Sequence, residues 1–161
     1  LLSATGMLAC GEDLGMVPDC VPEVMQRLHI LSLEVERMPK KANTPTADPK
    51  DAPYLSVCTT GTHDMSTLRG WWQEEHDCPM TAVEAEETVM RHLFSPAMWT
   101  ILPLQDWLAI DERLWRKDVD AERINVPANP KHIWRYRMHL SLERLQKAQS
   151  YNQHLQQLLY F

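Results

Sequence analysis

Segments with a strand pattern alternate with segments with a helix pattern along this chain, and acidic residues follow the strands. Residues 1–10 are small and apolar and run into the sequence GEDLG, which indicates a buried strand followed by a tight loop. Residues 54–60 are rich in strand-forming side chains and run into GTHD, which indicates a second such strand. This alternation favours a parallel sheet covered by helices, in which functional groups collect at the carboxyl ends of the strands. Glu12 and Asp64 are therefore candidate site residues.

Three other segments continue the alternating pattern. Apolar residues recur at helical spacing over 21–28, with Asp19 as a potential N-terminal cap. Period-two alternation over 31–38 predicts a strand. The segment 97–104 is predicted to form the last strand, which again runs into polar residues. One of these, Asp106, can act as a helix cap.

Further helices are expected in the second half of the chain. Ser66 can cap a helix that carries two tryptophans, and Thr81 with Glu84 fits a capping box for the next helix. A leucine- and glutamine-rich stretch over 140–159 predicts a final helix. The proline-broken polar stretches 39–53 and 119–130 are expected to be loops.

Composition and charge narrow the classes of partner and compartment. The chain has a net charge of -6, which disfavours a nucleic acid or an anionic membrane as its main partner. No apolar run approaches the roughly 20 residues that a membrane-spanning helix needs. The four cysteines contain no CxxC pair, so neither a zinc ribbon nor a small disulfide framework is encoded. We therefore expect a reducing, cytoplasmic environment.

The chain is too short to form a closed barrel by itself. A complete (β/α)8 TIM barrel needs about 250 residues, whereas 161 residues would supply three or four of its strands. The chain also begins within an apolar run, so we expect the C-terminal part of an incomplete barrel. Residues 1–139 would form that portion of the catalytic barrel, and 140–161 a C-terminal helix. The missing N-terminal part of the same enzyme is then an expected partner, and exposed strand edges would favour self-association of the chain.

Acids at strand ends, together with the aromatic content, indicate a sugar substrate. The chain has six Trp and four Tyr but only two Phe, and tryptophan offers a flat apolar face with a polar edge that matches a sugar ring. Cleavage of a glycosidic bond needs one carboxyl group as proton donor and a second that meets the anomeric carbon. From the residues alone, Glu12 pairs with Asp64 as acid and nucleophile.

Four motifs in order resemble one family of enzymes. GEDLG, then GTHD with TLRGWW, then ERINVP and finally WRYR are similar to motifs of the 4-alpha-glucanotransferases called amylomaltases or disproportionating enzymes. The last two motifs look closest to the cytosolic plant-type branch and its bacterial relatives. The resemblance implies a maltooligosaccharide or glucan substrate and no cofactor or metal.

The resemblance also changes the expected roles of the acids. It implies that Glu12 is the general acid/base, and that Asp64 stabilises the transition state by holding sugar hydroxyls, assisted by His63. It implies that the nucleophilic aspartate lies on an earlier strand outside this chain, so the chain alone is expected to be inactive. The remaining substrate-binding candidates are Asp13, Arg123 and Asn125.

Other interpretations of the same residues stay open at the level of sequence. The acids could be incidental in a noncatalytic glucan-binding fragment, or the chain could come from an alpha-amylase-type glycoside hydrolase. Arg123 and Asn125 could serve only a turn. A metal site at His63, Asp64, His76 and Asp77 is disfavoured because no pair among them has the spacing of a zinc or calcium motif.

Overall fold

The computed structural model describes residues 2–160, which divide into two compact units. The first unit takes in the described chain up to Thr62 together with Arg91–Pro103. The second unit takes in His63–Met90 and the described residues from Leu104 onward. Each unit has buried apolar side chains of its own, for example Leu31 and Val35 in the first and Leu68 and Val89 in the second.

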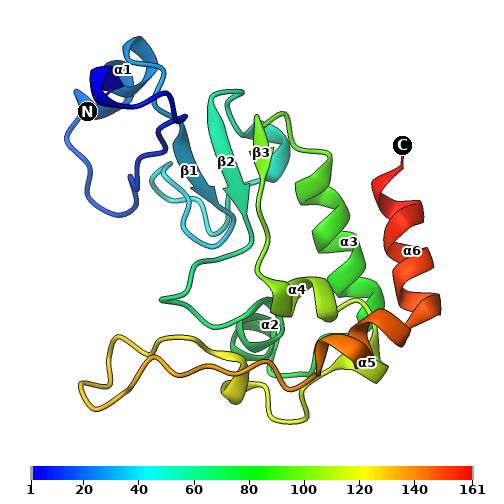
Figure 1. Ribbon diagram of the computed structural model, residues 1–161. Coiled ribbons are helices and arrows are strands. Elements are labelled where there is room, and N and C mark those ends of the chain that lie inside the picture. The colour runs from blue at the N-terminus through cyan, green and yellow to red at the C-terminus, as the bar shows by residue number, and fades with distance from the viewer. Residues whose placement is uncertain (1, 161) are drawn as a thin grey trace. The chain divides into compact units, whose positions relative to one another are not determined.

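A parallel sheet of three strands, in the order β1-β2-β3, forms the centre of the first unit (Figure 1). β1 (Ser32–Val35) pairs with β2 (Ser56–Thr59), and β2 pairs with β3 (Trp99–Thr100). All four residues of β2 are buried because this strand has a neighbour on each side. The predicted parallel α/β arrangement is thus confirmed for these three strands.

The strands are shorter than the sequence predicts, most clearly at β3. After Thr100, one further bond joins the Ile101 amide to the Cys58 carbonyl at 3.0 Å, and α4 (Leu104–Leu108) begins soon after. Pro103 ends the strand because it has no N–H to donate to a ladder. Asp106, expected just beyond a strand, therefore lies within a helix.

The strand predicted for residues 1–10 is wrong over most of its length. Leu2–Ala4 forms a 3-10 turn, and only Cys10 pairs with the sheet, through a parallel bridge to Leu31. Leu1 lies outside the described residues. The side chains of Met7 and Leu8 are exposed, so the apolar character of the segment is not used to fill a core in this unit.

α1 (Val21–Arg27) forms where helical spacing predicts it, but its expected cap is wrong. The N-cap residue is Cys20, and no side chain accepts a hydrogen bond there. The C-cap residue is Leu28, and the next residue, His29, is left-handed with a φ of 52°. The Ile30 amide then donates to the Met25 carbonyl at 2.9 Å, which is the six-to-one bond of a Schellman ending.

α2 (Leu68–His76) and α3 (Ala82–Leu93) follow β2 along the chain. The predicted capping box of α3 is confirmed, because Glu84 Oε2 accepts from the Thr81 amide at 2.7 Å and Thr81 Oγ1 accepts from the Glu84 amide at 3.3 Å. Ser66 does not cap α2, whose N-cap residue is Thr67.

The predicted helix over 140–159 is divided into α5 (Leu142–Lys147) and α6 (Gln149–Leu159). Ala148 interrupts it with a ψ of 64°. The Asn152 side chain donates to the carbonyls of Leu145 and Gln146 at 3.1 and 3.2 Å, so it takes over acceptors that a continuous helix would use. The domain boundary expected after residue 139 stays a prediction.

The two expected loops contain short 3-10 turns. Pro49–Asp51 lies within the first, and Asp120–Glu122 lies within the second. The second loop belongs to the same unit as α2 and α4, and it carries two of the candidate site residues, Arg123 and Asn125.

Candidate functional site

Asp64 and Asn125 form the centre of a polar cluster in the second unit. Asn125 Nδ2 donates to Asp64 Oδ1 at 2.6 Å, and His63 Nε2 lies 3.4 Å from the same oxygen. The side chains of His63 and Asp64 are 49% and 50% exposed. The structure thus brings together three of the residues predicted to hold substrate, and leaves them open to a ligand.

Backbone bonds hold Asn125 in this position. Its amide donates to the His63 carbonyl at 3.1 Å, and its Oδ1 accepts from the Val126 amide at 2.9 Å. Arg123 Nε donates to the Asn125 carbonyl at 3.4 Å. Arg123 therefore contacts the backbone next to the cluster, and its substrate-binding role stays a prediction.

Trp134 is a member of the cluster that the residue-by-residue prediction missed. Its ring lies against the His63 ring, with centroids 4.7 Å apart and an interplanar angle of 57°. Trp134 is 60% exposed, and a tryptophan face beside a carboxylate suits a sugar ring. The sequence feature that could have identified Trp134 as a site residue is its place in the WRYR motif.

Glu122 is buried beneath this loop and fixes its first turn. Its Oε2 accepts from Thr67 Oγ1 at 2.8 Å, and its Oε1 accepts from Arg69 Nη1 at 2.7 Å. The guanidinium of Arg69 also lies over the Trp115 ring, 4.2 Å from its centroid. The 3-10 turn that leads into Asn125 is therefore tied to the start of α2 by buried polar contacts.

Asp106 connects α4 to the same helix end. Its fully buried carboxylate accepts from the Leu68 amide at 2.9 Å, at the first residue of α2. An acid at this position satisfies an amide that has no partner within the helix and interacts favourably with the helix dipole. Asp106 thus caps a helix, as the sequence suggests, but it lies in α4 and caps α2.

Glu12 and Asp13 lie in the first unit, just after the Cys10 bridge to Leu31. Glu12 is exposed, and its Oε1 accepts from the Leu14 amide at 3.0 Å. Asp13 accepts from the Leu33 amide at 2.8 Å and pairs with Lys40 at 2.6 Å. Glu12 thus keeps its carboxyl group accessible, whereas Asp13 joins the GEDLG loop to β1; its substrate-binding role stays a prediction.

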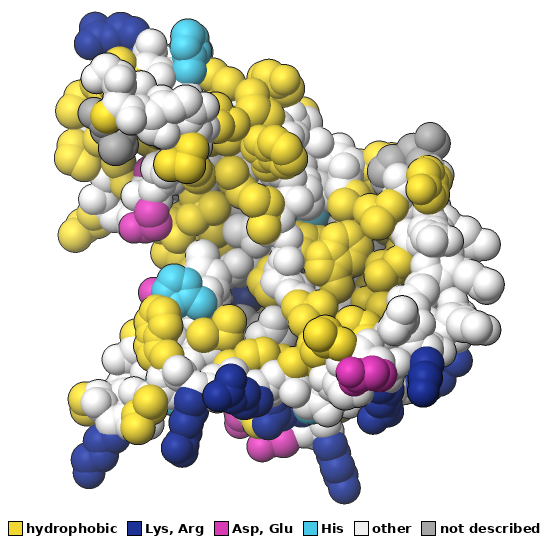
Figure 2. Space-filling model, in the orientation of Figure 1, with side chains coloured by type: hydrophobic (Ala, Val, Ile, Leu, Met, Phe, Trp, Pro, Cys, Tyr) yellow, Lys and Arg dark blue, Asp and Glu magenta, His cyan; other side chains and the backbone are white. Residues whose placement is uncertain are grey.

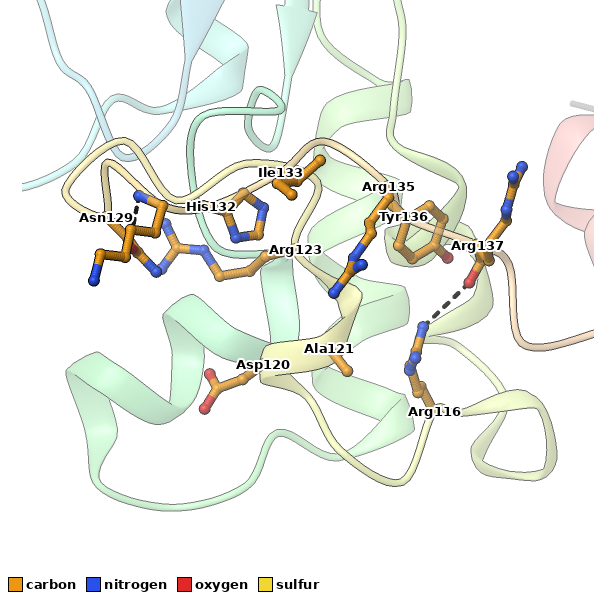
Figure 3. A pocket seen from close by; sticks show the side chains of 11 residues that line it. Arg116, Asp120, Ala121, Arg123, Asn129, His132, Ile133, Arg135, Tyr136 and Arg137 are labelled. Carbon is orange, nitrogen blue, oxygen red and sulfur yellow. Dashed lines mark hydrogen bonds between the residues drawn. The ribbon is translucent and has the colours of Figure 1, made fainter.

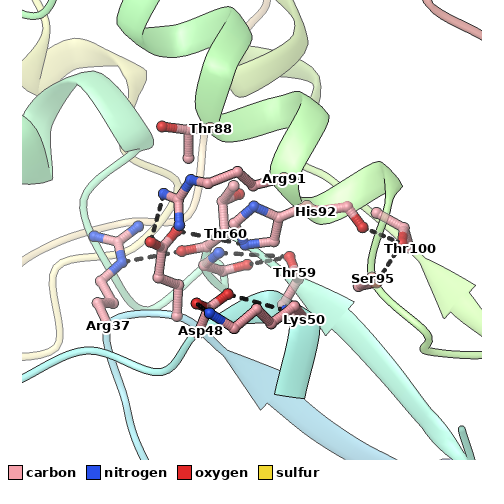
Figure 4. A network of polar contacts seen from close by, with 12 residues as sticks. Arg37, Asp48, Lys50, Thr59, Thr60, Thr88, Arg91, His92, Ser95 and Thr100 are labelled. Carbon is pink, nitrogen blue, oxygen red and sulfur yellow. Dashed lines mark hydrogen bonds and ion pairs between the residues drawn. The ribbon is translucent and has the colours of Figure 1, made fainter. Parts of the chain in front are cut away.

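A second polar network holds the chain just beyond β1 and β2 (Figure 4). Glu36 is buried and pairs with Arg91 Nη2 at 2.6 Å, while His92 Nε2 lies 3.6 Å from its other oxygen. Arg37 Nε donates to the Thr60 carbonyl at 3.2 Å. These contacts order the carboxyl ends of the two strands.

The described residues 2–160 hold neither a preformed metal site nor a helix able to span a membrane. No group of three or more His, Cys, Asp or Glu side chains in residues 2–160 is arranged to hold a metal ion. None of the helices described there has the length and apolarity to cross a bilayer. All four cysteines are free, and Cys58 is the buried one.

The first unit is thus a parallel α/β unit, and the second unit carries a cluster of carboxylate, amide, imidazole and tryptophan side chains. The chain belongs to the 4-alpha-glucanotransferase family, whose model matches residues 2–143.

Relatives with assigned functions are similar along most of the chain. It is 41% identical to 4-alpha-glucanotransferase DPE2 of Oryza sativa subsp. japonica over 90% of its length, and 30% identical to the 4-alpha-glucanotransferase of Chlamydia pneumoniae over 99%. It spans only 17% and 34% of those two proteins.

Solved structures show the same fold. The amylomaltase of Streptococcus agalactiae in complex with acarbose matches 94% of this chain with a TM-score of 0.69 and 15% sequence identity. The amylomaltase of Corynebacterium glutamicum matches 91% with the same TM-score. The chain covers 31% and 28% of these structures.

Proposed function

We propose that this chain is part of a retaining 4-alpha-glucanotransferase that moves alpha-1,4-glucan segments between maltooligosaccharides or glucans. The observation that carries the proposal is the Asp64 cluster. A half-exposed carboxylate held by an amide, beside an exposed tryptophan, offers acceptors for sugar hydroxyls and a flat face for the ring. Membership of the family supports this use of the cluster.

In this proposal, Asp64 holds hydroxyls of the sugar at which the bond is cleaved. Hydrogen bonds to ring hydroxyls that strengthen in the oxocarbenium-like transition state lower the barrier. Asn125 and His63 fix the carboxylate, and Trp134 holds the ring. Arg123 positions Asn125 through its backbone carbonyl.

Glu12 acts as the general acid and then as the general base. In the first step, an aspartate outside this chain forms an ester with the anomeric carbon while the glycosidic bond breaks and Glu12 gives its proton to the departing oxygen. In the second step, Glu12 takes the proton from the 4-hydroxyl of an acceptor glucan, whose oxygen displaces the ester. Glu12 is suited to both steps because its carboxyl group is exposed at the carboxyl side of the strand pairing.

The three parallel strands would belong to a larger (β/α)8 barrel, of which this chain supplies a C-terminal portion. The short edge strand β3 and the exposed apolar side chains of Trp99 and Ile101 support further strands beyond this edge. The whole enzyme would act in the cytoplasm, and this portion alone would have no turnover because the nucleophile lies elsewhere.

Product analysis of the longer protein tests the proposal. A transferase incubated with maltotriose yields glucose and longer maltooligosaccharides while the number of reducing ends stays constant. Accumulation of reducing ends would instead identify an alpha-amylase-type hydrolase. Binding of maltooligosaccharides without any turnover would identify a noncatalytic glucan-binding protein.

Variants then test the roles of the two acids. Glu12→Gln and Asp64→Asn should each lower kcat by about 100-fold or more. Asp19→Asn is a matched control, because Asp19 is also an exposed acid of the first unit. Near-normal disproportionation by either site variant would overturn the role assigned to that residue.

A further inference from the structure

Residues between 116 and 137 line an open pocket of about 460 Å³ within the second unit (Figure 3). Most of the charged residues that line it are basic: Arg116, Arg123, Lys131, Arg135 and Arg137, with Asp120 as the one acid among the lining residues. In the space-filling view, Lys and Arg side chains gather along the lower border, over this segment (Figure 2). The pocket is thus strongly basic in a chain whose net charge is -6.

The cations of this pocket have no carboxylate partners among the described residues. Among the described residues 2–160, ion pairs form at Lys40, Arg69 and Arg113, for example, but none of the five pocket cations forms one. Like charges that face a shared cavity repel one another and focus a positive potential in it. An anion bound there would relieve this repulsion.

Two of the guanidinium groups are held in place by backbone carbonyls. Arg116 Nη1 donates to the Arg137 carbonyl at 3.2 Å, and Arg123 Nε donates to the Asn125 carbonyl at 3.4 Å. Each of these bonds uses one donor of a five-donor fork, so further N–H groups remain for a ligand. Figure 3 shows the Arg135 side chain directed toward the turn that carries Asp120 and Ala121.

One residue that lines the pocket, Tyr136, has a buried hydroxyl group. Its hydroxyl oxygen has no hydrogen-bond partner among the described residues. Burial, and the nearby charge of Glu122, raise the pKa of Tyr136, so the hydroxyl keeps its proton at neutral pH. A buried hydroxyl without a partner costs free energy, which an added acceptor would offset.

We propose that this pocket binds a phosphate monoester or inorganic phosphate, held by Arg116 and Arg135. The planar fork of arginine matches the oxygens of a phosphate group with paired, charge-assisted hydrogen bonds. The shared chemistry is the phosphoryl dianion, whether free or carried on a sugar. The site is separate from the Asp64 cluster but is joined to it by the Arg123 bond to Asn125.

Titration of the full chain tests the proposal without reference to glucan transfer. Arginine Nε–Hε signals are followed by NMR at constant ionic strength while inorganic phosphate, a hexose 6-phosphate or the unphosphorylated hexose is added. We expect saturable shifts of the Arg116 and Arg135 signals with both phosphates and none with the neutral sugar. Tighter binding of the hexose phosphate would assign the site to a phosphorylated sugar, and equal binding to the phosphate group itself.

A double variant and a matched control localise the binding. Arg116→Gln with Arg135→Gln should weaken phosphate binding by about tenfold or more, and Arg27→Gln should leave it unchanged because Arg27 is an exposed arginine of the first unit. Shifts that do not saturate, or that are equal at Arg27, would overturn the proposal, as would wild-type affinity in the double variant. If the double variant is unfolded, the shifts measured on the unaltered chain alone test whether phosphate binds in this pocket.

Discussion

The Asn125 side chain donates a 2.6 Å hydrogen bond to the carboxylate of Asp64, across 61 positions of sequence. The bond joins the turn after β2 to the irregular loop that follows the Asp120–Glu122 turn. Asn125 thus places a neutral donor, not a second negative charge, beside the Asp64 carboxylate. The account of the site depends on this neutral partner.

Asn125→Asp should therefore impair glucan transfer by the longer protein. A second carboxylate at hydrogen-bond distance raises the pKa of the pair, because like charges disfavour ionisation. We expect kcat/KM to fall and the acidic limb of its pH profile to move to higher pH. Kinetics across a pH series check this, with the exposed loop variant Asn43→Asp as control. An unchanged profile would contradict the role of Asn125.

Trp134→Ala should weaken substrate binding more than it slows the chemical step. Loss of the exposed ring beside His63 removes a stacking surface worth about 0.5–1.5 kcal/mol. We expect KM for maltooligosaccharides to rise several-fold while kcat changes less. Tyr160→Ala, at another exposed aromatic residue, serves as the comparison. A fall in kcat with unchanged KM would refute a stacking role.

Glu122→Gln should destabilise the second unit. The side chains of Glu122 and Arg69 are 5% and 13% exposed, so loss of the charge weakens two buried hydrogen bonds, at a cost of about 1.5–3 kcal/mol. Urea unfolding measures this change. Asp48→Asn, in the exposed pair with Lys50, should have little effect. Equal losses in the two variants would show that burial of the Glu122 pair is unimportant.

Cys58 should make the fold less stable at alkaline pH. Burial raises the pKa of the Cys58 thiol to about 11, from an ordinary value of 9.0. Between these two values the unfolded chain loses the thiol proton while the folded chain keeps it, so the free energy of unfolding falls as pH rises from about 9 to about 11. Burial raises the pKa of Tyr151 to about 12, which acts in the same direction at higher pH.

Comparison with Cys58→Ala isolates the thiol. The variant should lose stability at neutral pH, because a small cavity remains, but should show a flatter decline above about pH 9 than the unaltered chain. Urea unfolding at a series of pH values provides the measurement. Parallel declines in the two proteins would show that Cys58 does not titrate as described.

Local patterns predicted the elements whose determinants lie within a few residues. The capping box at Thr81 and Glu84, the helical spacing in α1 and the strand-forming run of β2 all gave the right type of structure. The same patterns failed where a distant residue decides. Nothing near Ser66 indicates that Asp106 accepts from the first amide of α2, and nothing near Ala148 except Asn152 indicates that the last helix breaks there.

The candidate site was likewise predicted where the determinants are local and missed where they are distant. The motifs around His63, Asp64 and Asn125 identified residues that the structure joins in one cluster. The contact of Trp134 with His63 was not predicted because it depends on how the 126–134 loop folds back. Asp13 was selected for substrate binding, but its contacts to Leu33 and Lys40 depend on a pairing across the sheet that local sequence does not encode.

The role of Glu12 as acid/base in a retaining mechanism is tested most directly by chemical rescue of Glu12→Ala in the longer protein. With an alpha-maltosyl fluoride donor, the leaving group needs no proton, so the ester intermediate should form and then accumulate. Added azide, which needs no general base, should accelerate turnover and yield a glycosyl azide with the alpha configuration. A variant that gains nothing from azide, or that is as impaired on the fluoride as on maltotriose, would contradict the account.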